Sequence, residues 1–94
     1  MFNLKKTDYF EHWLTSLRDL RAKAKILARL KRAELGNLGV HKSVGDRVFE
    51  MIIDYGPGYR VYFARSQNVL IFLLFGGDKS SQVKDIKRAK QICV

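Results

Sequence analysis

DYGPGYRVYF at Asp54–Phe63 and GGDKSSQ at Gly76–Gln82 are the two stretches that decide the fold of this chain. The first predicts a tight turn that leads into a strand, because Gly tolerates positive φ and Pro presets its own φ. The second predicts a sharp turn from a strand into a helix, with Lys79 at the start of that helix. A short hairpin between them would bring the two stretches side by side. Fixed cations and aromatic rings gathered in this way suit a phosphate-rich polymer better than a small metabolite.

Upstream of these stretches, the sequence predicts a short strand over Phe2–Lys6 and then two helices. Thr7 and Asp19 are suitable N-caps, and Gly36 is a suitable C-terminal cap. The apolar face expected for the first helix is Phe10, Trp13, Leu14 and Leu17. For the second helix, over Leu20–Leu35, the expected buried stripe is Leu20, Ala24, Leu27 and Leu30, with the cations Lys23, Lys25, Arg29, Lys31 and Arg32 in water. The short link between the helices predicts an antiparallel hairpin.

The second half of the chain predicts strands over Val48–Asp54, Tyr59–Arg65 and Val69–Phe75. The last of these is apolar on both faces and therefore belongs inside a sheet. Helical spacing resumes over Asp78–Ile92, through Val83, Ile86, Ala89 and Ile92. The segment 36–46 is rich in turn residues and predicts a loop. The whole predicts one α+β domain over residues 1–94: a short N-terminal strand and a helical hairpin on a small twisted antiparallel sheet, followed by a C-terminal helix.

The composition points to an anionic partner. The chain carries 18 Lys and Arg against 9 Asp and Glu, a formal net charge of +9. A field of that size draws in nucleic acid or an acidic protein surface. The N-terminus lacks the apolar core of a signal peptide, so we expect a cytoplasmic protein. One cysteine excludes a disulfide framework, and His12 and His41 have no partners at metal-ligand spacing. We therefore expect no metal and no other cofactor.

Strand alternation selects candidate functional residues within Tyr59–Phe63. Arg60 and Tyr62 share one face and are set apart from the apolar face of Tyr59, Val61 and Phe63. An arginine there can grip a phosphate with two hydrogen bonds, and a tyrosine can stack on a base. The alternative is that Arg60 pairs with Asp54 or Glu50 while Tyr62 caps the sheet.

Lys79 is the second candidate cation. The N–H groups at the start of a helix favour an anion, and a lysine beside them adds to the attraction. The alternative is that Asp78 or Ser80 caps the helix and Lys79 is only solvated. GGDKSSQ is not a phosphate-binding Walker loop, because Asp78 stands where that motif needs glycine.

Taken together and in order, five motifs resemble the RelE/ParE toxin superfamily, and most closely the HigB-like addiction module killer proteins of bacteria and phages. The motifs are FExWLxxLxD from Phe10, AKIxxRLxR from Ala24, LGNLG from Leu35, GPGYRVYF from Gly56 and GGDKSSQ from Gly76. The resemblance covers almost the whole chain, and it implies the same α+β fold.

The resemblance implies the toxin of a type II toxin–antitoxin system. Its usual activity is metal-independent cleavage of mRNA on the translating ribosome, which stops translation. Its partners would be the ribosome, the mRNA and a small antitoxin with a helix-turn-helix domain, so that it meets DNA only through the antitoxin. Arg60 matches the family's strand arginine, and Lys79 falls where relatives carry a basic residue. With Tyr62 they form the implied catalytic set, and His41, Lys42, Tyr59 and Gln82 form the implied RNA-binding rim.

The sequence also departs from the family pattern. The strand before the turn reads Glu50-Met51-Ile52-Ile53, where better-known relatives carry lysines. Closer killer proteins have an arginine at the position of Ile52, and the C-terminal tyrosine of some relatives has no match. Two alternatives therefore stay open: a ParE-like toxin that poisons DNA gyrase, and a catalytically weakened relative that binds RNA or the ribosome without turnover.

Overall fold

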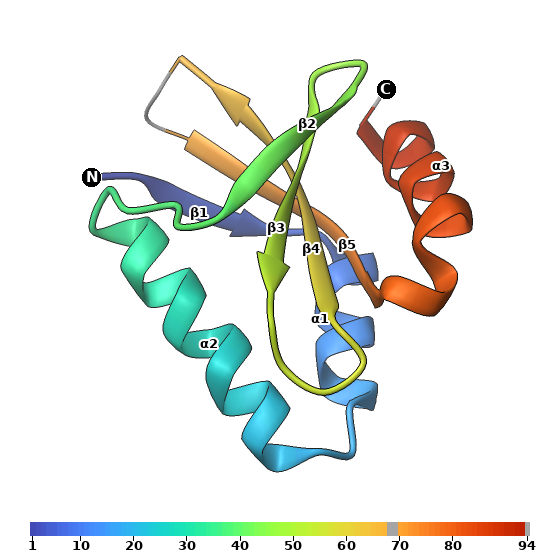
Figure 1. The fold of residues 1–94 in the computed structure, drawn as a ribbon. Helices are drawn as coiled ribbons and strands as arrows, with labels where there is room; N and C mark the ends of the chain where they lie inside the picture. The colour runs from blue at the N-terminus through green and yellow to red at the C-terminus, as the bar shows by residue number, and fades with distance from the viewer. Residues whose placement is uncertain (68–69, 94) are drawn as a thin grey trace.

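A computed structural model describes residues 1–67 and 70–93 as one mixed sheet with three α-helices (Figure 1). Along the chain the elements are β1 (Asn3–Lys6), α1 (Asp8–Ser16), α2 (Leu20–Glu34), β2 (His41–Gly45), β3 (Val48–Ile53), β4 (Tyr59–Ser66), β5 (Leu70–Asp78), a 3-10 turn (Lys79–Ser81) and α3 (Gln82–Cys93). The strand order is β1-β5-β4-β3-β2. The predicted α+β class and C-terminal helix are confirmed. Two predicted positions, Asn68 and Val69, lie outside the described residues.

The sheet is mixed, which corrects the predicted antiparallel sheet. β1 pairs in parallel with β5, from Asn3 opposite Leu70 to Lys6 opposite Leu73, while the other neighbours are antiparallel. Thr7 ties this junction together. Its hydroxyl lies 2.9 and 2.8 Å from the carbonyl oxygens of Leu73 and Leu74, and it accepts a bond from the N–H of Phe10 as the predicted N-cap of α1. A pairing between segments so distant in sequence has no local signal in either strand.

The segment predicted as a loop over residues 36–46 contains the edge strand β2. His41–Gly45 pairs with β3, and its exposed side chains explain why no apolar alternation marked it. Arg29 fixes the chain that leads into this strand: its guanidinium donates to the carbonyl oxygens of Ile52 (2.5 Å), Leu38 (3.2 Å) and Val40 (3.1 Å). Arg29 was expected in water, and here its burial lowers the pKa of its guanidinium, helped by the charge of Arg32.

The buried face of α2 differs from the predicted stripe. Asp19 caps the helix as predicted, and the inner side chains are Ala22, Ile26, Leu30 and Ala33. Leu20 is 75% exposed and Leu27 44% exposed. The predicted set and the observed set both have helical spacing, and both include Leu30. Contact with the sheet decides which of the two sets is buried. α1 packs against β5 whereas α2 reaches β3, so the predicted hairpin is open (Figure 1). Gly36 ends α2 with φ +101°.

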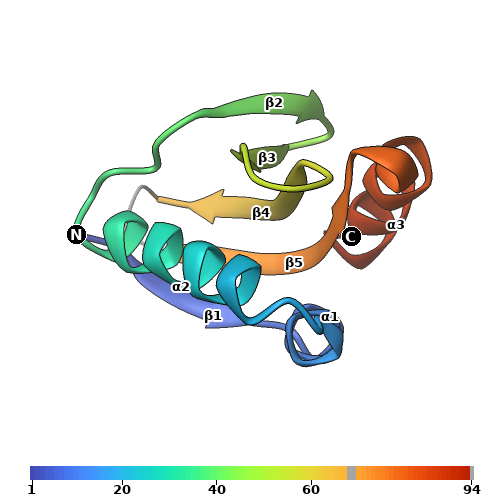
Figure 2. The same cartoon turned by 60° about the horizontal axis from the view of Figure 1, so that its bottom comes forward.

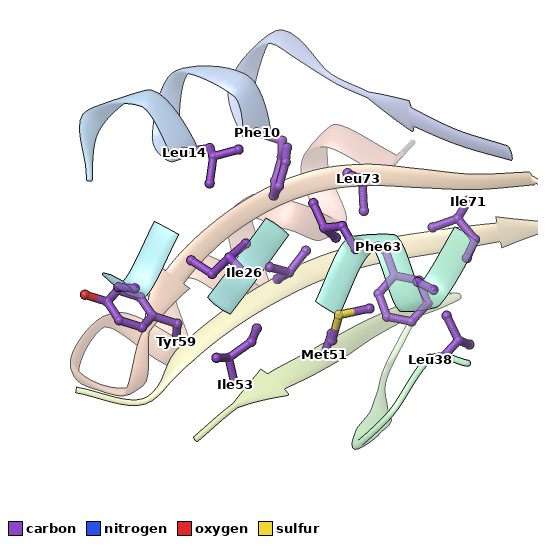
Figure 3. Packing of buried hydrophobic residues seen from close by; sticks show 14 residues of the cluster. Phe10, Leu14, Ile26, Leu38, Met51, Ile53, Tyr59, Phe63, Ile71 and Leu73 are labelled. Carbon is purple, nitrogen blue, oxygen red and sulfur yellow. The ribbon is translucent and has the colours of Figure 1, made fainter. Parts of the chain in front are cut away.

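Two apolar clusters lie on opposite faces of the sheet. The larger one fills the space between the sheet and α1 with α2, and it includes Phe10, Ile26, Met51, Phe63 and Leu73 (Figure 3). The smaller one lies under α3 and includes Val48, Tyr62, Ala64, Leu74 and Ala89. The predicted alternation in β4 is confirmed, since Tyr59, Val61 and Phe63 join the larger cluster.

The buried face of the C-terminal helix agrees with the prediction at three positions. Ala89 is buried, and Ile86 and Ile92 pack beside it. Val83, however, is exposed, and Asp85 takes the inner position. The strand before the helix also differs from expectation. Gly76 and Gly77 are not in a turn but inside β5, opposite Val61 and Arg60. A side chain at Gly76 would overlap the ring of Trp13, and one at Gly77 would overlap the carboxylate of Asp85.

Gly76→Ala should therefore lower the free energy of unfolding by about 1–3 kcal/mol, because the added methyl group meets the Trp13 ring. Urea unfolding followed by far-UV circular dichroism measures this. In the Trp13→Leu background the same substitution should cost clearly less, since the smaller side chain leaves room. Equal costs in both backgrounds would show that the ring is not what excludes a side chain at this position.

Candidate functional site

Glu50 is the centre of the candidate site. It lies on β3, faces α3, and is fully buried. Its direct neighbours across the sheet are Lys42 on β2 and Tyr62 on β4. A buried carboxylate is costly unless cations and hydrogen-bond donors surround it, so the side chains around Glu50 must supply these groups.

Three side chains from three elements approach the carboxylate of Glu50. The amide nitrogen of Gln82, at the start of α3, lies 3.1 and 3.0 Å from its two oxygens. The ammonium of Lys42 lies 3.5 Å from Oε1, and Nε of Arg60 lies 3.9 Å from Oε2. Lys42, Arg60 and Gln82, all predicted site residues, are thus brought together. We name Glu50, Lys42, Arg60 and Gln82 the Glu50 cluster.

The arginine of this cluster is held from two sides. The side chain of Arg60 is only 12% exposed. Besides the ion pair with Glu50, its Nη1 donates to the carbonyl oxygen of Gly58 at 3.0 Å and approaches that of Tyr59 at 3.5 Å. Of the two acidic partners considered for Arg60, Glu50 is the one at ion-pair distance. The arginine is fixed in place and already carries part of its hydrogen-bonding capacity.

Lys79 and this arginine both border Gly58. A Cβ built on Gly58 would be 3.2 Å from Nη1 of Arg60 and 3.5 Å from Cβ of Lys79. Lys79 itself is exposed. The carboxylate of Asp78 caps the 3-10 turn by accepting bonds from the N–H and the hydroxyl of Ser80. The structure therefore agrees with the alternative considered for this segment, in which Asp78 is the cap and Lys79 is exposed to solvent.

Tyr62 is not accessible for stacking on a base. Its side chain is fully buried, so no face of its ring is open to a base, and this part of the prediction is corrected. Its hydroxyl has no hydrogen-bond partner among the described residues. The pKa of Tyr62 is strongly raised, first by burial and then by the charges of Glu50 and Asp85, with a smaller opposing effect of Arg60. Tyr62 thus remains a neutral phenol behind the cluster.

His41 and Tyr59 lie on the other face of the sheet, away from Glu50. The ring of His41 lies 6.4 Å from that of Phe49 and 6.1 Å from that of Phe63, measured between centroids. Tyr59 belongs to the larger core cluster, where its ring meets Trp13 edge-on at 6.5 Å. The structure therefore separates these two predicted rim residues from Lys42, Arg60, Lys79 and Gln82.

Sequence reasoning missed that Glu50 and Asp85 are buried. Asp85 lies on the inner side of α3 and accepts a hydrogen bond from the hydroxyl of Ser81. For Glu50 the sequence does contain a signal. It stands between Phe49 and Met51, in a strand whose other residues are apolar. Asp85 has no such signal, because an acidic residue in a charged helix normally faces water.

A basic groove leads away from the Glu50 cluster along α3. It is lined by Ser80, Ser81, Gln82, Val83, Ile86 and the lysines Lys79, Lys84, Lys87 and Lys90. Gln82 connects it to the cluster, while Lys90 also pairs with Asp46 of the β2–β3 turn at 3.5 Å. Over residues 1–67 and 70–93, no group of three or more His, Cys, Asp or Glu side chains could hold a metal ion. The arrangement can hold an anion by fixed cations and hydrogen-bond donors.

Glu50→Ala should lower the free energy of unfolding by about 3 kcal/mol or more, because it leaves Arg60 without its counter-charge and opens a cavity. Glu50→Gln keeps the shape and one acceptor oxygen, so its cost should be smaller. Urea unfolding of the two variants measures the difference. If Glu50→Ala is as stable as the wild type, the carboxylate does not organise this part of the fold.

Tyr62→Phe should change how stability depends on pH. Because the folded state holds the phenolic proton more tightly than the unfolded chain, the wild-type protein should lose stability as the pH rises above about 10, the ordinary pKa of tyrosine. The phenylalanine variant should lose less over the same range. At pH 7 it should be at least as stable, since the hydroxyl has no partner. Urea unfolding between pH 7 and about 11.5 tests both points, and parallel curves would contradict the buried phenol.

The described part of the structure contains no helix long and apolar enough to cross a membrane. No protein family model and no solved structure matches the sequence. A protein of Haemophilus influenzae, named only as an uncharacterized protein, is 58% identical over 87 residues, which are 93% of this chain and 88% of that one. At this identity over nearly the full length of both, the chain belongs to the same family as the uncharacterized Haemophilus influenzae protein.

Proposed function

We propose that this protein is the toxin of a type II toxin–antitoxin system, and that it cleaves ribosome-bound mRNA without a metal ion. The observation that carries the proposal is that Arg60 and Lys79 both border Gly58, with Arg60 beside the buried carboxylate of Glu50 and Lys79 at the end of a basic groove. RNA cleavage without a metal needs fixed cations at the phosphate and a nearby proton acceptor. This corner of the molecule offers both.

Each group has a defined role in the proposed reaction. The 2′-hydroxyl oxygen of the ribose attacks the adjacent phosphorus, and the bond from phosphorus to the 5′-oxygen of the next nucleotide breaks. The guanidinium of Arg60 stabilises the charge that grows on the phosphate oxygens. Lys79 donates a proton to the departing 5′-oxygen. The 2′-hydroxyl proton passes to Glu50, the carboxylate that Arg60 already contacts.

The free protein must rearrange before it can react in this way. Glu50 is fully buried, and Lys42 and Gln82 cover its oxygens. Binding of a phosphate would let Arg60 and Lys42 exchange the carboxylate for a phosphate oxygen, which uncovers Glu50. The need for such an exchange agrees with an enzyme that acts only when the ribosome holds its substrate in place.

The charge distribution supports the proposed partners. A net charge of +9 and the lysines along α3 favour the RNA surface of a ribosome, with affinity from the phosphate backbone rather than from base sequence. The proposed setting is the cytoplasm of a bacterium or a phage-infected cell. The proposed regulator is a small antitoxin with a helix-turn-helix domain, through which alone the toxin would meet DNA.

A second function is favoured by one specific observation. In this structure Nε of Arg60 lies at ion-pair distance from Glu50, and its Nη1 donates to the carbonyl oxygen of Gly58 and approaches that of Tyr59. If that arrangement persists on the ribosome, Arg60 is structural. The protein would then be a basic RNA-binding or ribosome-binding relative without turnover.

Arg60→Ala should reduce mRNA cleavage by about a hundredfold or more, since it removes the cation at the reacting phosphate. The measurement is an in vitro translation reaction with purified protein, with mRNA ends mapped by primer extension in the presence and absence of ribosomes. The matched control is Arg21→Ala, which removes an exposed arginine from α2, on the other face of the sheet. Circular dichroism confirms that both variants are folded.

Four outcomes separate the possible functions. Ribosome-dependent cuts that disappear in Arg60→Ala and persist in Arg21→Ala support the nuclease. Cuts that persist in a folded Arg60→Ala protein contradict the role of this arginine. Intact mRNA with wild-type protein bound to ribosomes supports the relative without turnover, and intact mRNA without ribosome binding leads next to a DNA gyrase supercoiling assay.

A further inference from the structure

The tip of the hairpin formed by β2 and β3 has a backbone conformation that favours glycine. Asp46 and Arg47 join the two strands, with φ of +53° and +65°. Positive φ at both central residues is the geometry of a type I′ turn, which prefers glycine at the second of them. Arg47 holds that second position. Its Cβ makes the left-handed conformation costly, whereas glycine would adopt it freely.

No polar contact inside the protein explains why an arginine stands in this turn. Arg47 is exposed, and within residues 1–67 and 70–93 its guanidinium makes no hydrogen bond and no ion pair. Residues with costly backbone conformations are common where a protein binds a ligand or a substrate. The guanidinium of Arg47 is available to such a ligand, and the side chains around it indicate its chemistry.

Arg47 lines a hollow between the hairpin tip and the C-terminal half of α3. Figure 2 shows the turn that joins β2 to β3 beside this helix. The hollow has a volume of about 470 Å³, and its charged lining residues are Asp46, Arg47, Lys87 and Lys90. The ammonium of Lys90 lies 3.5 Å from the carboxylate of Asp46, which ties the tip to α3. The side chain of Lys87 is exposed and, like that of Arg47, has no polar partner among the described residues.

The charges around this hollow favour an anion. Among the described residues, three cations line it, against the single carboxylate of Asp46. The carbonyl end of α3 adds a negative charge of about one half, which is too small to reverse the balance. Arg47 and Lys87 come from different elements and can therefore bind one anion together. Guanidinium and ammonium groups both bind phosphate oxygens well.

The hollow continues the basic groove along α3, since Lys87 and Lys90 line both. The groove begins near Gln82, and the helix from residue 82 to residue 90 rises by about 12 Å. A strand of RNA covers this distance with a few nucleotides. A polymer with phosphates at regular intervals can therefore occupy the groove and the hollow at the same time.

We propose that Arg47 and Lys87 bind a phosphodiester group of RNA at the hairpin tip, a few nucleotides away from Arg60. The free energy lost by placing an arginine in the turn is offset when its guanidinium binds the phosphate. The proposal concerns binding and does not rest on mRNA cleavage, so either can fail without the other.

Arg47→Gly tests the proposal, because stability and binding should change in opposite directions. The midpoint of thermal unfolding should rise by about 2–5 °C, since glycine forms the turn without strain. Fluorescence anisotropy measures affinity for a labelled single-stranded oligouridylate with 2′-O-methyl riboses, which cannot be cleaved through the 2′-oxygen. This affinity should fall about fivefold. The slope of log affinity against log salt concentration should become shallower by about 0.7, the value for one phosphate contact.

Two other variants make the comparison specific. Lys87→Ala removes a cation from the same hollow and leaves the turn unchanged, so it should weaken binding by a similar factor. Arg21→Ala removes an exposed arginine from α2, on the other face of the sheet, and should bind like the wild type. The oligouridylate annealed to its complement identifies the source of the phosphate. Tighter binding of the single strand points to mRNA, and tighter binding of the duplex points to helices of ribosomal RNA.

Four results would overturn the proposal. Unchanged affinity of folded Arg47→Gly would show that the arginine does not contact RNA. An equal loss in Arg21→Ala would reduce the effect to net charge. An unfolding midpoint of Arg47→Gly that stays the same or falls would show that the turn is not strained. Competition by a polyglutamate peptide of the same charge, as strong as that of unlabelled oligonucleotide, would assign the hollow to an acidic protein.

Discussion

The site depends on the burial of one carboxylate. A buried carboxylate loses its hydration, and only cations and hydrogen-bond donors close to it can offset that loss. Glu50 obtains them from β2, β4 and α3, through Lys42, Arg60 and Gln82. The edge strand, the turn at Gly58 and the start of the last helix are thereby fixed relative to one another.

A second constraint acts on β5, which lies between β1 and β4 in the sheet. Gly76 and Gly77 leave β5 without side chains at a point where residues of α1 and α3 lie against its backbone. Trp13 of α1 occupies the space on one side and Asp85 of α3 the space on the other. The close approach of Asp85 also brings its charge near Tyr62, where it acts with Glu50 to raise the pKa of that phenol. The same glycine pair thus serves the packing of the fold and the electrostatics of the site.

The two faces of the sheet differ in their side chains. The face under α3 holds the Glu50 cluster and the lysine-lined groove, and it is the face suited to a phosphate backbone. The face under α1 and α2 holds the larger apolar core.

The sequence by itself determined the elements with strong local signals. The caps at Thr7 and Asp19, the turn at Gly56–Gly58, the alternation of β4 and the end of α2 at Gly36 all follow from backbone geometry and hydrogen bonding within a few residues. Arg60, Lys79, Lys42 and Gln82 could be selected from the same signals and from family resemblance. Tertiary structure alone decided which of two apolar stripes α2 buries, that β1 joins β5 in parallel, and that residues 41–45 form an edge strand. It also decided that Glu50 is the partner of Arg60 and that Tyr62 is buried. These outcomes depend on contacts between residues far apart in the sequence. No local sequence pattern indicates the free energy of such contacts.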